Sequence, residues 1–259
     1  MKLLKSIVKK ILSFSGYDLV KTTRNSQDFL LSNQFSDFSQ SDLEIIKLIK
    51  PFTMTSPERL YALVKAIEYI SNNNIRGDIV ECGVWKGGSM MAIAHTLLRM
   101  NDINRNLYLF DTFEGMTPPS QEDLSFTNDN ALQLLQDSNK EDQTSIWCYA
   151  PLEEVMTNLH STGYASDKIY FIKGEVEKTI PKKAPDQIAV LRLDTDWYES
   201  TRHELENLFP RLVSGGVIII DDYGYWKGCR KATDEYILNN KVQILLNRID
   251  FTGRIGIKL

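Results

Sequence analysis

The stretch 189–223 reads AVLRLDTDWYESTRHELENLFPRLVSGGVIIIDDY and holds two apolar runs that each end in acidic residues. Asp194 and Asp196 follow the first run, and Asp221 and Asp222 follow the second. The segment between the runs has the apolar spacing of an amphipathic helix, and the SGG before the second run is expected to form a tight turn. This order predicts a strand, a helix and a second strand.

Two parallel strands joined through a helix have their carboxyl ends on the same edge of a sheet. Asp194 and Asp221, 27 positions apart in the chain, are therefore expected to become neighbours in space. Carboxylates held that close need a cation, or one of them must hold a proton. The sequence thus predicts a charged site at this edge.

The composition is that of an ordinary globular protein, with 259 residues, 42% hydrophobic and 25% charged. A net charge of −4 argues against nucleic acid as the main partner, because binding to phosphates requires a basic surface. The three cysteines, Cys82, Cys148 and Cys229, have no paired spacing. We therefore expect free thiols and a cytoplasmic protein.

The N-terminal segment 1–20 is basic and has apolar residues able to share one helical face. It is interpreted as a docking helix or a contact between copies in a homo-oligomer, rather than as a membrane contact. Lys9 and Lys10 interrupt any apolar core, which argues against a signal peptide. The predicted organisation is a helical extension or lid over 1–50 and a catalytic domain over 51–259, with 26–42 either a cover over the site or a connecting loop.

Strand patterns alternate with helix patterns along the rest of the chain. A helix is expected after the cap Ser56-Pro57, and the polar segment 117–149 is expected to be an insertion that covers the site. Two short strands around Asp250 to Gly253 suggest a hairpin at the sheet edge. Five further strands are predicted at 78–82, 107–113, 168–174, 188–196 and 215–223. Together they predict an α/β fold with a doubly wound sheet.

The loop GVWKGGS joins the first predicted strand to a helix and follows Glu81. A glycine-rich turn at this place lets a nucleotide-like cofactor approach the backbone. The spacing is neither G-x-G-x-x-G nor the phosphate-binding pattern that ends in Lys-Ser/Thr, so dinucleotides and triphosphates are disfavoured. Asp111, at the end of the second strand, is either a ligand for ribose hydroxyls or an acid that caps a turn.

Five blocks carry a family resemblance: TMTSPERLYAL, GDIVECGVWKGGSM, LYLFDTFEGM, LRLDTDWYEST and GGVIIIDDYGYWKGCRKA. Their order and spacing resemble those of the macrocin O-methyltransferase family, the TylF/MycF type. The resemblance implies the class I methyltransferase fold, S-adenosylmethionine (SAM) as methyl donor, and a divalent metal, usually Mg²⁺. It also implies that the acceptor is a hydroxyl of a sugar or glycosylated natural product.

The resemblance further implies which residues bind the cofactor. Glu81, Gly83 and Ser89 would line its methionine and ribose, Asp111 would hold the ribose hydroxyls, and Phe113 would lie near the adenine. The full set is Thr53, Met54, Glu81, Gly83, Val84, Trp85, Ser89, Asp111, Thr112, Phe113, Gly174, Glu175 and Asp194.

The acidic residues at the ends of the two runs suit a hard divalent cation. Carboxylate oxygens of Asp194, Asp221 and Asp222 are ligands for Mg²⁺ or Ca²⁺ rather than Zn²⁺, and no His or Cys cluster competes with them. A bound cation lowers the pKa of a coordinated hydroxyl. The general base is expected to be Asp194 by preference, with Asp196 as its rival.

Two other enzyme functions and one non-enzymatic function stand beside this interpretation. The same acids can hold the adjacent hydroxyls of a catechol-like phenol. A nucleotide-dependent oxidoreductase is disfavoured by the absent glycine pattern. A scaffold protein that retains the fold would show a damaged cofactor loop or missing acids, and neither is seen.

Overall fold

The structure is a computed structural model, which describes residues 35–142 and 144–259. The expected N-terminal helix at 1–20 lies outside the described residues. The chain divides into two compact units, Met1–Leu43 and Glu44–Leu259. Helix α3 (Gln40–Ile49) crosses this division, while the expected boundary at residue 50 stays a prediction. Among the described residues, no helix combines the length and the apolar character that a membrane span requires.

The second unit is built on a seven-stranded sheet with the order β3-β2-β1-β4-β5-β7-β6. Strands β1 to β5 are parallel, and β7 runs antiparallel to both β5 and β6. The strands are β1 (Asp78–Cys82), β2 (Leu107–Asp111), β3 (Ile169–Lys173), β4 (Ile188–Leu193), β5 (Leu212–Ile220), β6 (Asn247–Arg248) and β7 (Arg254–Ile257). The doubly wound sheet and its C-terminal hairpin are thereby confirmed.

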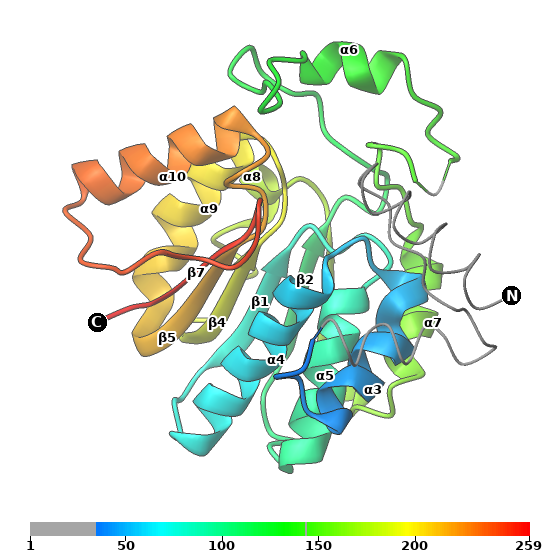
Figure 1. Ribbon diagram of the computed structural model, residues 1–259, viewed down its shortest axis with the longest axis vertical. Helices are drawn as coiled ribbons and strands as arrows, with labels where there is room; N and C mark the ends of the chain where they lie inside the picture. The colour runs from blue at the N-terminus through cyan, green and yellow to red at the C-terminus, as the bar shows by residue number, and fades with distance from the viewer. Residues whose placement is uncertain (1–34, 143) are drawn as a thin grey trace, which may run out of the picture. The chain divides into compact units, whose positions relative to one another are not determined.

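Helices cover both faces of this sheet (Figure 1). One face carries α4 (Pro57–Asn72), α5 (Gly88–Met100) and α7 (Leu152–His160), and the other carries α8 (Val176–Thr179), α9 (Tyr198–Leu208) and α10 (Lys227–Asn239). The remaining helical segments are α6 (Ala131–Gln136) and the single 3₁₀ turns η1 (Lys50–Phe52), η2 (Ser166–Lys168) and η3 (Phe209–Arg211). The strand order reverses between the neighbours β1 and β4, because the chain returns from β3 at the sheet edge to β4 beside β1. Ligands bind at such a point in open α/β sheets.

Helix α4 begins where the sequence predicts. The Ser56 hydroxyl accepts a hydrogen bond from the Arg59 backbone N–H at 3.1 Å, and Pro57 occupies the first helical position, where no N–H is needed. The apolar face that follows is buried, with Leu60, Val64 and Ile67 at most 1% exposed. This burial fixes the start of α4 beside the ends of the strands.

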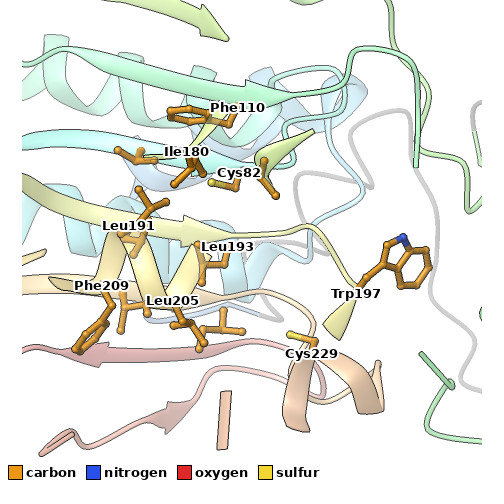
Figure 2. Close-up of a cluster of buried hydrophobic side chains, with 14 of the residues drawn as sticks. Cys82, Phe110, Ile180, Leu191, Leu193, Trp197, Leu205, Phe209 and Cys229 are labelled. Atoms are coloured by element: carbon orange, nitrogen blue, oxygen red, sulfur yellow. The ribbon is translucent and has the colours of Figure 1, made fainter. Parts of the chain in front are cut away.

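The hydrophobic core lies along β4, whose six residues are all buried. One cluster, drawn in Figure 2, joins Phe110 of β2, Leu191 of β4 and Leu205 of α9. Each such side chain contributes about 1.5–3 kcal/mol on burial. Cys82 and Cys229 belong to the same cluster as free thiols, and Cys148 is also free, so the expected absence of a disulfide framework is confirmed.

Several sequence-based strand boundaries were wrong, including the predicted end of β5 at 223, which lies at Ile220. The expected SGG turn lies inside β5, because Gly215 adopts a left-handed φ of 81° and bulges the strand while its N–H bonds the Lys258 carbonyl at 2.7 Å. Strand β4 ends at Leu193 rather than at 196, and β2 ends at Asp111 rather than at 113. The acids after these strands therefore sit on turns, where strand alternation no longer sets their direction.

Candidate active site

A cavity of about 510 Å³ opens at the carboxyl ends of β1, β2, β4 and β5. Most of the predicted site residues line it, although Glu81 and Phe113 do not. Those that do are Thr53, Met54, Gly83, Val84, Trp85, Ser89, Asp111, Thr112, Gly174, Glu175, Asp194, Asp196, Asp221 and Asp222. The structure thus brings residues from six separate segments to the edge that the sequence indicated.

The loop after β1 approaches the end of β4 closely enough to require glycine. Gly83 has a φ of 78°, and a Cβ there would overlap the Asp194 carbonyl oxygen. Gly88, at the start of α5, lies against the Phe52 carbonyl in the same way. These contacts pack the loop between two neighbouring segments, which is why no larger residue fits.

Asp111 is held by backbone amides. Its Oδ2 accepts hydrogen bonds from the N–H groups of Val84 at 2.7 Å and Trp85 at 3.3 Å, and its Oδ1 accepts one from Phe113 at 2.7 Å. Burial raises the pKa of this carboxyl, and the backbone N–H groups oppose that shift. Asp111 therefore acts as a clamp between the β1 and β2 loops, while its predicted contact with ribose stays a prediction.

Glu81 and Phe113 lie below the cavity rather than on its surface. The register of β1 with β4 places Glu81 opposite Arg192, so its side chain, 1% exposed, turns to that guanidinium. Burial raises the pKa of Glu81 to about 8, and its Oε2 has no hydrogen-bond partner. Phe113 is 3% exposed and follows the end of β2 with a φ of 53°. Their predicted cofactor contacts have no support in this arrangement.

Asp194, Asp221 and Asp222 form the acid cluster, in which one oxygen from each lies within 4.8 Å of the others. Burial raises the pKa of Asp194, against the opposing charge of Arg192, and burial together with the neighbouring acids raises the pKa of Asp222. Asp222 Oδ2 is buried and has no hydrogen-bond partner. A buried carboxylate oxygen without a partner is costly unless a proton or a cation meets it.

Arg192 is the central partner of these acids and is 2% exposed. Its guanidinium donates to Asp194 Oδ2 and to Asp221 Oδ1, each at 2.6 Å, and also to Glu81. It makes a further bond to the Thr55 hydroxyl at 3.2 Å. Arg192 thus pairs with three acids and supplies part of the positive charge that the cluster was predicted to need.

Arg59 is a second guanidinium in the site, which sequence reasoning missed. It lines the cavity from α4, pairs with Asp221 and donates through Nε to Asp250 Oδ2 at 3.0 Å. Arg59 and Asp221 are 162 positions apart, so no local pattern connects them. Through these ion pairs, Arg59 connects the start of α4 to the end of β5 and to the turn before β7.

The buried charges do not balance. Five acids, Glu81, Asp194, Asp196, Asp221 and Asp222, face two guanidinium groups, which leaves three negative charges if all are ionised. Arg59 is also shared with Asp250. The cluster therefore has to hold protons or take up a cation, as the sequence predicted.

Asp196 sits on the turn after β4 with a φ of 68°, a conformation that residues other than glycine rarely adopt. Burial raises its pKa to about 7, and hydrogen bonds from Asp222 and Trp226 oppose the shift. Trp85 and Cys148, which also line the cavity, have left-handed φ values of 46° and 45°. Such conformations gather at functional sites, since the surrounding structure must impose them.

The segment 117–149 contributes one wall of the cavity, as expected of a covering insertion. It is attached to the start of α9 through Asp123, whose Oδ1 accepts the Tyr198 N–H at 2.7 Å. It is attached to the start of α10 through the Leu124 carbonyl, which accepts the Lys227 N–H at 2.9 Å. The indole of Trp197 also donates to the Thr117 carbonyl at 2.9 Å. Sequence reasoning missed Asp123, because a cap supplied by a distant segment leaves no local signal.

The three histidines, His95, His160 and His203, do not line the cavity. The cavity combines a glycine-containing loop, a clamped acid on β2 and a cluster of acids with excess negative charge.

The model of one protein family, Macrocin-O-methyltransferase (TylF), matches residues 22–255. The chain belongs to this family. It is 35% identical over 201 residues to 8-demethyl-8-(2,3-dimethoxy-alpha-L-rhamnosyl)-tetracenomycin-C 4'-O-methyltransferase of Streptomyces olivaceus, which covers 78% of this chain and 73% of that protein. It is 32% identical over 202 residues to mycinamicin III 3''-O-methyltransferase of Micromonospora griseorubida, covering 78% and 76%.

Solved structures agree with this assignment. The O-methyltransferase NovP superposes with a TM-score of 0.69 at 30% identity, over 80% of this chain and 82% of that chain. The calicheamicin methyltransferase CalS11 superposes with a TM-score of 0.61 at 17% identity, over 93% and 94%, and shows the shared fold. The protein is an O-methyltransferase with the class I fold, and the oxidoreductase and scaffold interpretations are set aside.

Proposed function

We propose that this enzyme transfers a methyl group from SAM to a hydroxyl of a sugar-containing small molecule, with a divalent cation, Mg²⁺ or a similar ion, in the acid cluster. The observation that carries the proposal is the buried, unpartnered Asp222 Oδ2 in a cluster with excess negative charge, beside the glycine-containing loop. The names of the relatives support the acceptor class, since they methylate glycosylated natural products.

The cofactor half of the cavity suits SAM. Gly83, Val84 and Ser89 present backbone and small side chains to the space, and Asp111 stands at the end of β2, where a ribose is held in this class of sheet. Thr53 and Met54 line the same space before α4. We assign the methionine and ribose to this half of the cavity.

The donor set of the acid cluster fits a hard cation. Asp194, Asp221 and Asp222 supply only oxygens, and each carboxylate oxygen has lone pairs beyond the one used by an arginine. When bound, the cation lowers the pKa of the acceptor hydroxyl and offsets part of the excess negative charge. The two arginines hold Asp194 and Asp221 in place through the bonds described above.

We assign the role of proton acceptor to Asp196 rather than to Asp194, which the sequence favoured. Asp194 Oδ2 is occupied by Arg192, whereas Asp196 has no arginine among the bonds described and has a pKa of about 7. A base with a pKa near the working pH combines the ionised form with proton affinity. Asp196→Asn is expected to reduce kcat with little change in cation binding.

The proposal is tested by methyl transfer from radiolabelled SAM to a panel of methyl and aryl glycosides and catechol, after treatment with EDTA and again after Mg²⁺ is restored. We expect label in a glycoside, loss of transfer with EDTA and recovery with Mg²⁺. Transfer that persists in EDTA would overturn the cation assignment. Transfer to catechol alone would show that the acceptor is a phenol rather than a sugar.

A homo-oligomer and a cytoplasmic location stay predictions.

A further inference from the structure

A row of aromatic rings leads from the core to the surface beside the acid cluster. Trp197 packs edge-to-face on Trp226 at 4.9 Å between ring centroids, and Trp226 packs on Tyr225 at 5.0 Å. Phe126 lies 5.4 Å from Tyr225 and 4.9 Å from Phe251, again edge-to-face. The row joins the insertion, the turn after β5 and the turn before β7.

Exposure rises sharply along this row. Trp197 and Trp226 are 3% and 4% exposed, whereas Phe126 and Phe251 are 46% and 48% exposed. Two half-exposed phenylalanine rings contribute less to stability than buried ones would, since each aromatic side chain can bury on the order of 150–250 Å². Contiguous exposed apolar groups beside a cavity indicate a ligand-binding surface.

The backbone on both sides of the exposed rings is firmly held. Ser125 forms a bridge with Trp226, and the Leu124 carbonyl accepts the Lys227 N–H at 2.9 Å. On the other side, Asp250 Oδ1 accepts the N–H groups of Thr252 at 2.9 Å and Gly253 at 2.7 Å. The two rings are therefore preorganised rather than carried on free loops, which lowers the entropy lost on binding.

The two exposed rings lie next to residues that line the cavity, although neither ring lines it. Tyr225, which Phe126 contacts, and Thr252, which follows Phe251, line it together with Asp221 and Asp222. The Gly224 N–H donates to the Thr252 carbonyl at 2.8 Å, so the turn after β5 and the turn bearing Phe251 form one wall. A molecule with its hydroxyl at the acid cluster has this wall directly beside it.

We propose that Phe126, Tyr225 and Phe251 form an aromatic platform that binds a planar, apolar ring system joined to the sugar acceptor. The inference rests on the proposed function and specifies the class of acceptor as an aryl glycoside rather than a free sugar. A sugar is recognised through many hydrogen bonds, whereas the two phenylalanines offer only ring faces and edges. Edge-to-face and offset ring contacts contribute about 0.5–1.5 kcal/mol each.

The test compares p-nitrophenyl α-L-rhamnoside with methyl α-L-rhamnoside, because the two share the sugar and differ in the aryl ring. Binding of each to the full-length protein loaded with S-adenosylhomocysteine (SAH) and Mg²⁺ is measured by calorimetry. We expect the aryl glycoside to bind about 10-fold more tightly, which corresponds to about 1.4 kcal/mol. The double variant Phe126→Ala/Phe251→Ala is expected to bind both glycosides equally.

Tyr170→Ala is the matched control, since Tyr170 is 41% exposed on β3 at the opposite end of the strand order. It is expected to keep the preference. Phe126→Leu/Phe251→Leu keeps apolar surface without rings and is expected to lose most of the preference. Unchanged SAH binding in the variants verifies that the fold is retained.

Equal binding of both glycosides by the wild type, binding of neither, or a preference that survives the double alanine variant would each overturn the platform. Sedimentation that shows a wild-type dimer and a monomeric double variant would also overturn it, by making this surface an interface between copies. An aryl preference that depends on the two phenylalanines, without methyl transfer to either glycoside, would support the platform and contradict the proposed function.

Discussion

The two halves of the cavity satisfy their acids in opposite ways. In the cofactor half, Asp111 receives its hydrogen bonds from backbone N–H groups and the Thr112 hydroxyl. In the half assigned to the acceptor, Arg192 and Arg59 face four acids that line the cavity and Glu81, which does not line it. Asp222 Oδ2 and Glu81 Oε2 remain without partners. Neutral N–H and O–H donors are enough to stabilise a single buried carboxylate, whereas a cluster of carboxylates needs positive charge.

This difference indicates which half of the cavity has partners for its carboxylates when no ligand is bound. In the half assigned to the cofactor, both oxygens of Asp111 have hydrogen-bond donors, so this half is expected to bind SAM whether or not a cation is present. The acceptor half holds excess negative charge that its own residues do not neutralise. Each variant below alters one half of the cavity, and Asp111→Asn also tests whether the other half is affected.

The largest effect is expected from Arg192→Met, which removes the guanidinium that three acids share. Breaking a buried ion pair leaves uncompensated charge and costs about 3–5 kcal/mol of unfolding free energy. Urea denaturation measures it. Arg202→Met is the control, because Arg202 is exposed and pairs only with the surface residues Glu199 and Glu206, so a loss below about 1 kcal/mol is expected. Equal losses in the two variants would contradict the central role of Arg192.

Asp222→Asn is expected to lower methyl transfer by at least about 100-fold, since changing a residue that only supports a metal ligand already costs about 10–100-fold. The same substitution removes a buried, unpaired charge, so the metal-free protein is expected to melt at a higher temperature. Activity and thermal stability therefore move in opposite directions. Asp186→Asn, at an exposed position away from the cavity, is expected to change neither. A destabilised Asp222→Asn would argue against an unpaired charge.

Asp111→Asn is expected to weaken SAM binding by about 10-fold, since an amide nitrogen replaces an oxygen that accepts backbone hydrogen bonds of about 1.5–3 kcal/mol. Calorimetry with SAM and with Mg²⁺ measures both halves in one variant. Mg²⁺ binding is expected to stay unchanged. A parallel loss of Mg²⁺ binding would show that the two halves are not separable.

The last effect is a pH dependence from Glu81, expected in the metal-free protein. Its pKa of about 8 in the folded protein lies above the ordinary value of 4.5. The stability this provides is fully present below about pH 4.5 and is lost as the pH rises to about 8, because the folded state holds the proton more tightly. We expect the unfolding free energy to fall across this window, with a contribution from Glu81 of at most about 1.4 kcal/mol per pH unit.

Glu81→Gln isolates this contribution, since the amide keeps the shape and cannot ionise. Its unfolding free energy is expected to fall less steeply between pH 4.5 and 8. Some decline should remain, because burial also raises the pKa of Asp196 to about 7. If the unfolding free energy of Glu81→Gln changed with pH as steeply as that of the wild type, Glu81 would not be one of the acids whose ionisation destabilises the folded protein.

The strand-end acids could be predicted from the sequence because apolar runs, a helical spacing and the rule for parallel strands each act locally. Arg192 could be expected to pair an acid, since it interrupts a buried run. The positions of Glu81 and Phe113 could not be predicted. Glu81 turns toward Arg192 through the register of β1 with β4, and Phe113 is set by a turn that begins one residue after Asp111.

Contacts between segments that are distant in the sequence could not be predicted either. Arg59 reaches Asp221, Asp123 caps α9, and Phe126 meets Phe251 only because the fold brings separate turns to one wall. Each of these residues has an ordinary local context in the sequence. Packing of the whole sheet, rather than any nearby pattern, decides their partners.

Titration of Mg²⁺ into the SAH-loaded protein, for wild type and for Asp222→Asn, tests the central claim that the acid cluster is completed by a cation. The account predicts one ion bound per wild-type chain and no measurable binding to Asp222→Asn, with SAH affinity equal in both. Wild-type protein that binds no Mg²⁺, or a variant that binds it as tightly as the wild type, would contradict the claim.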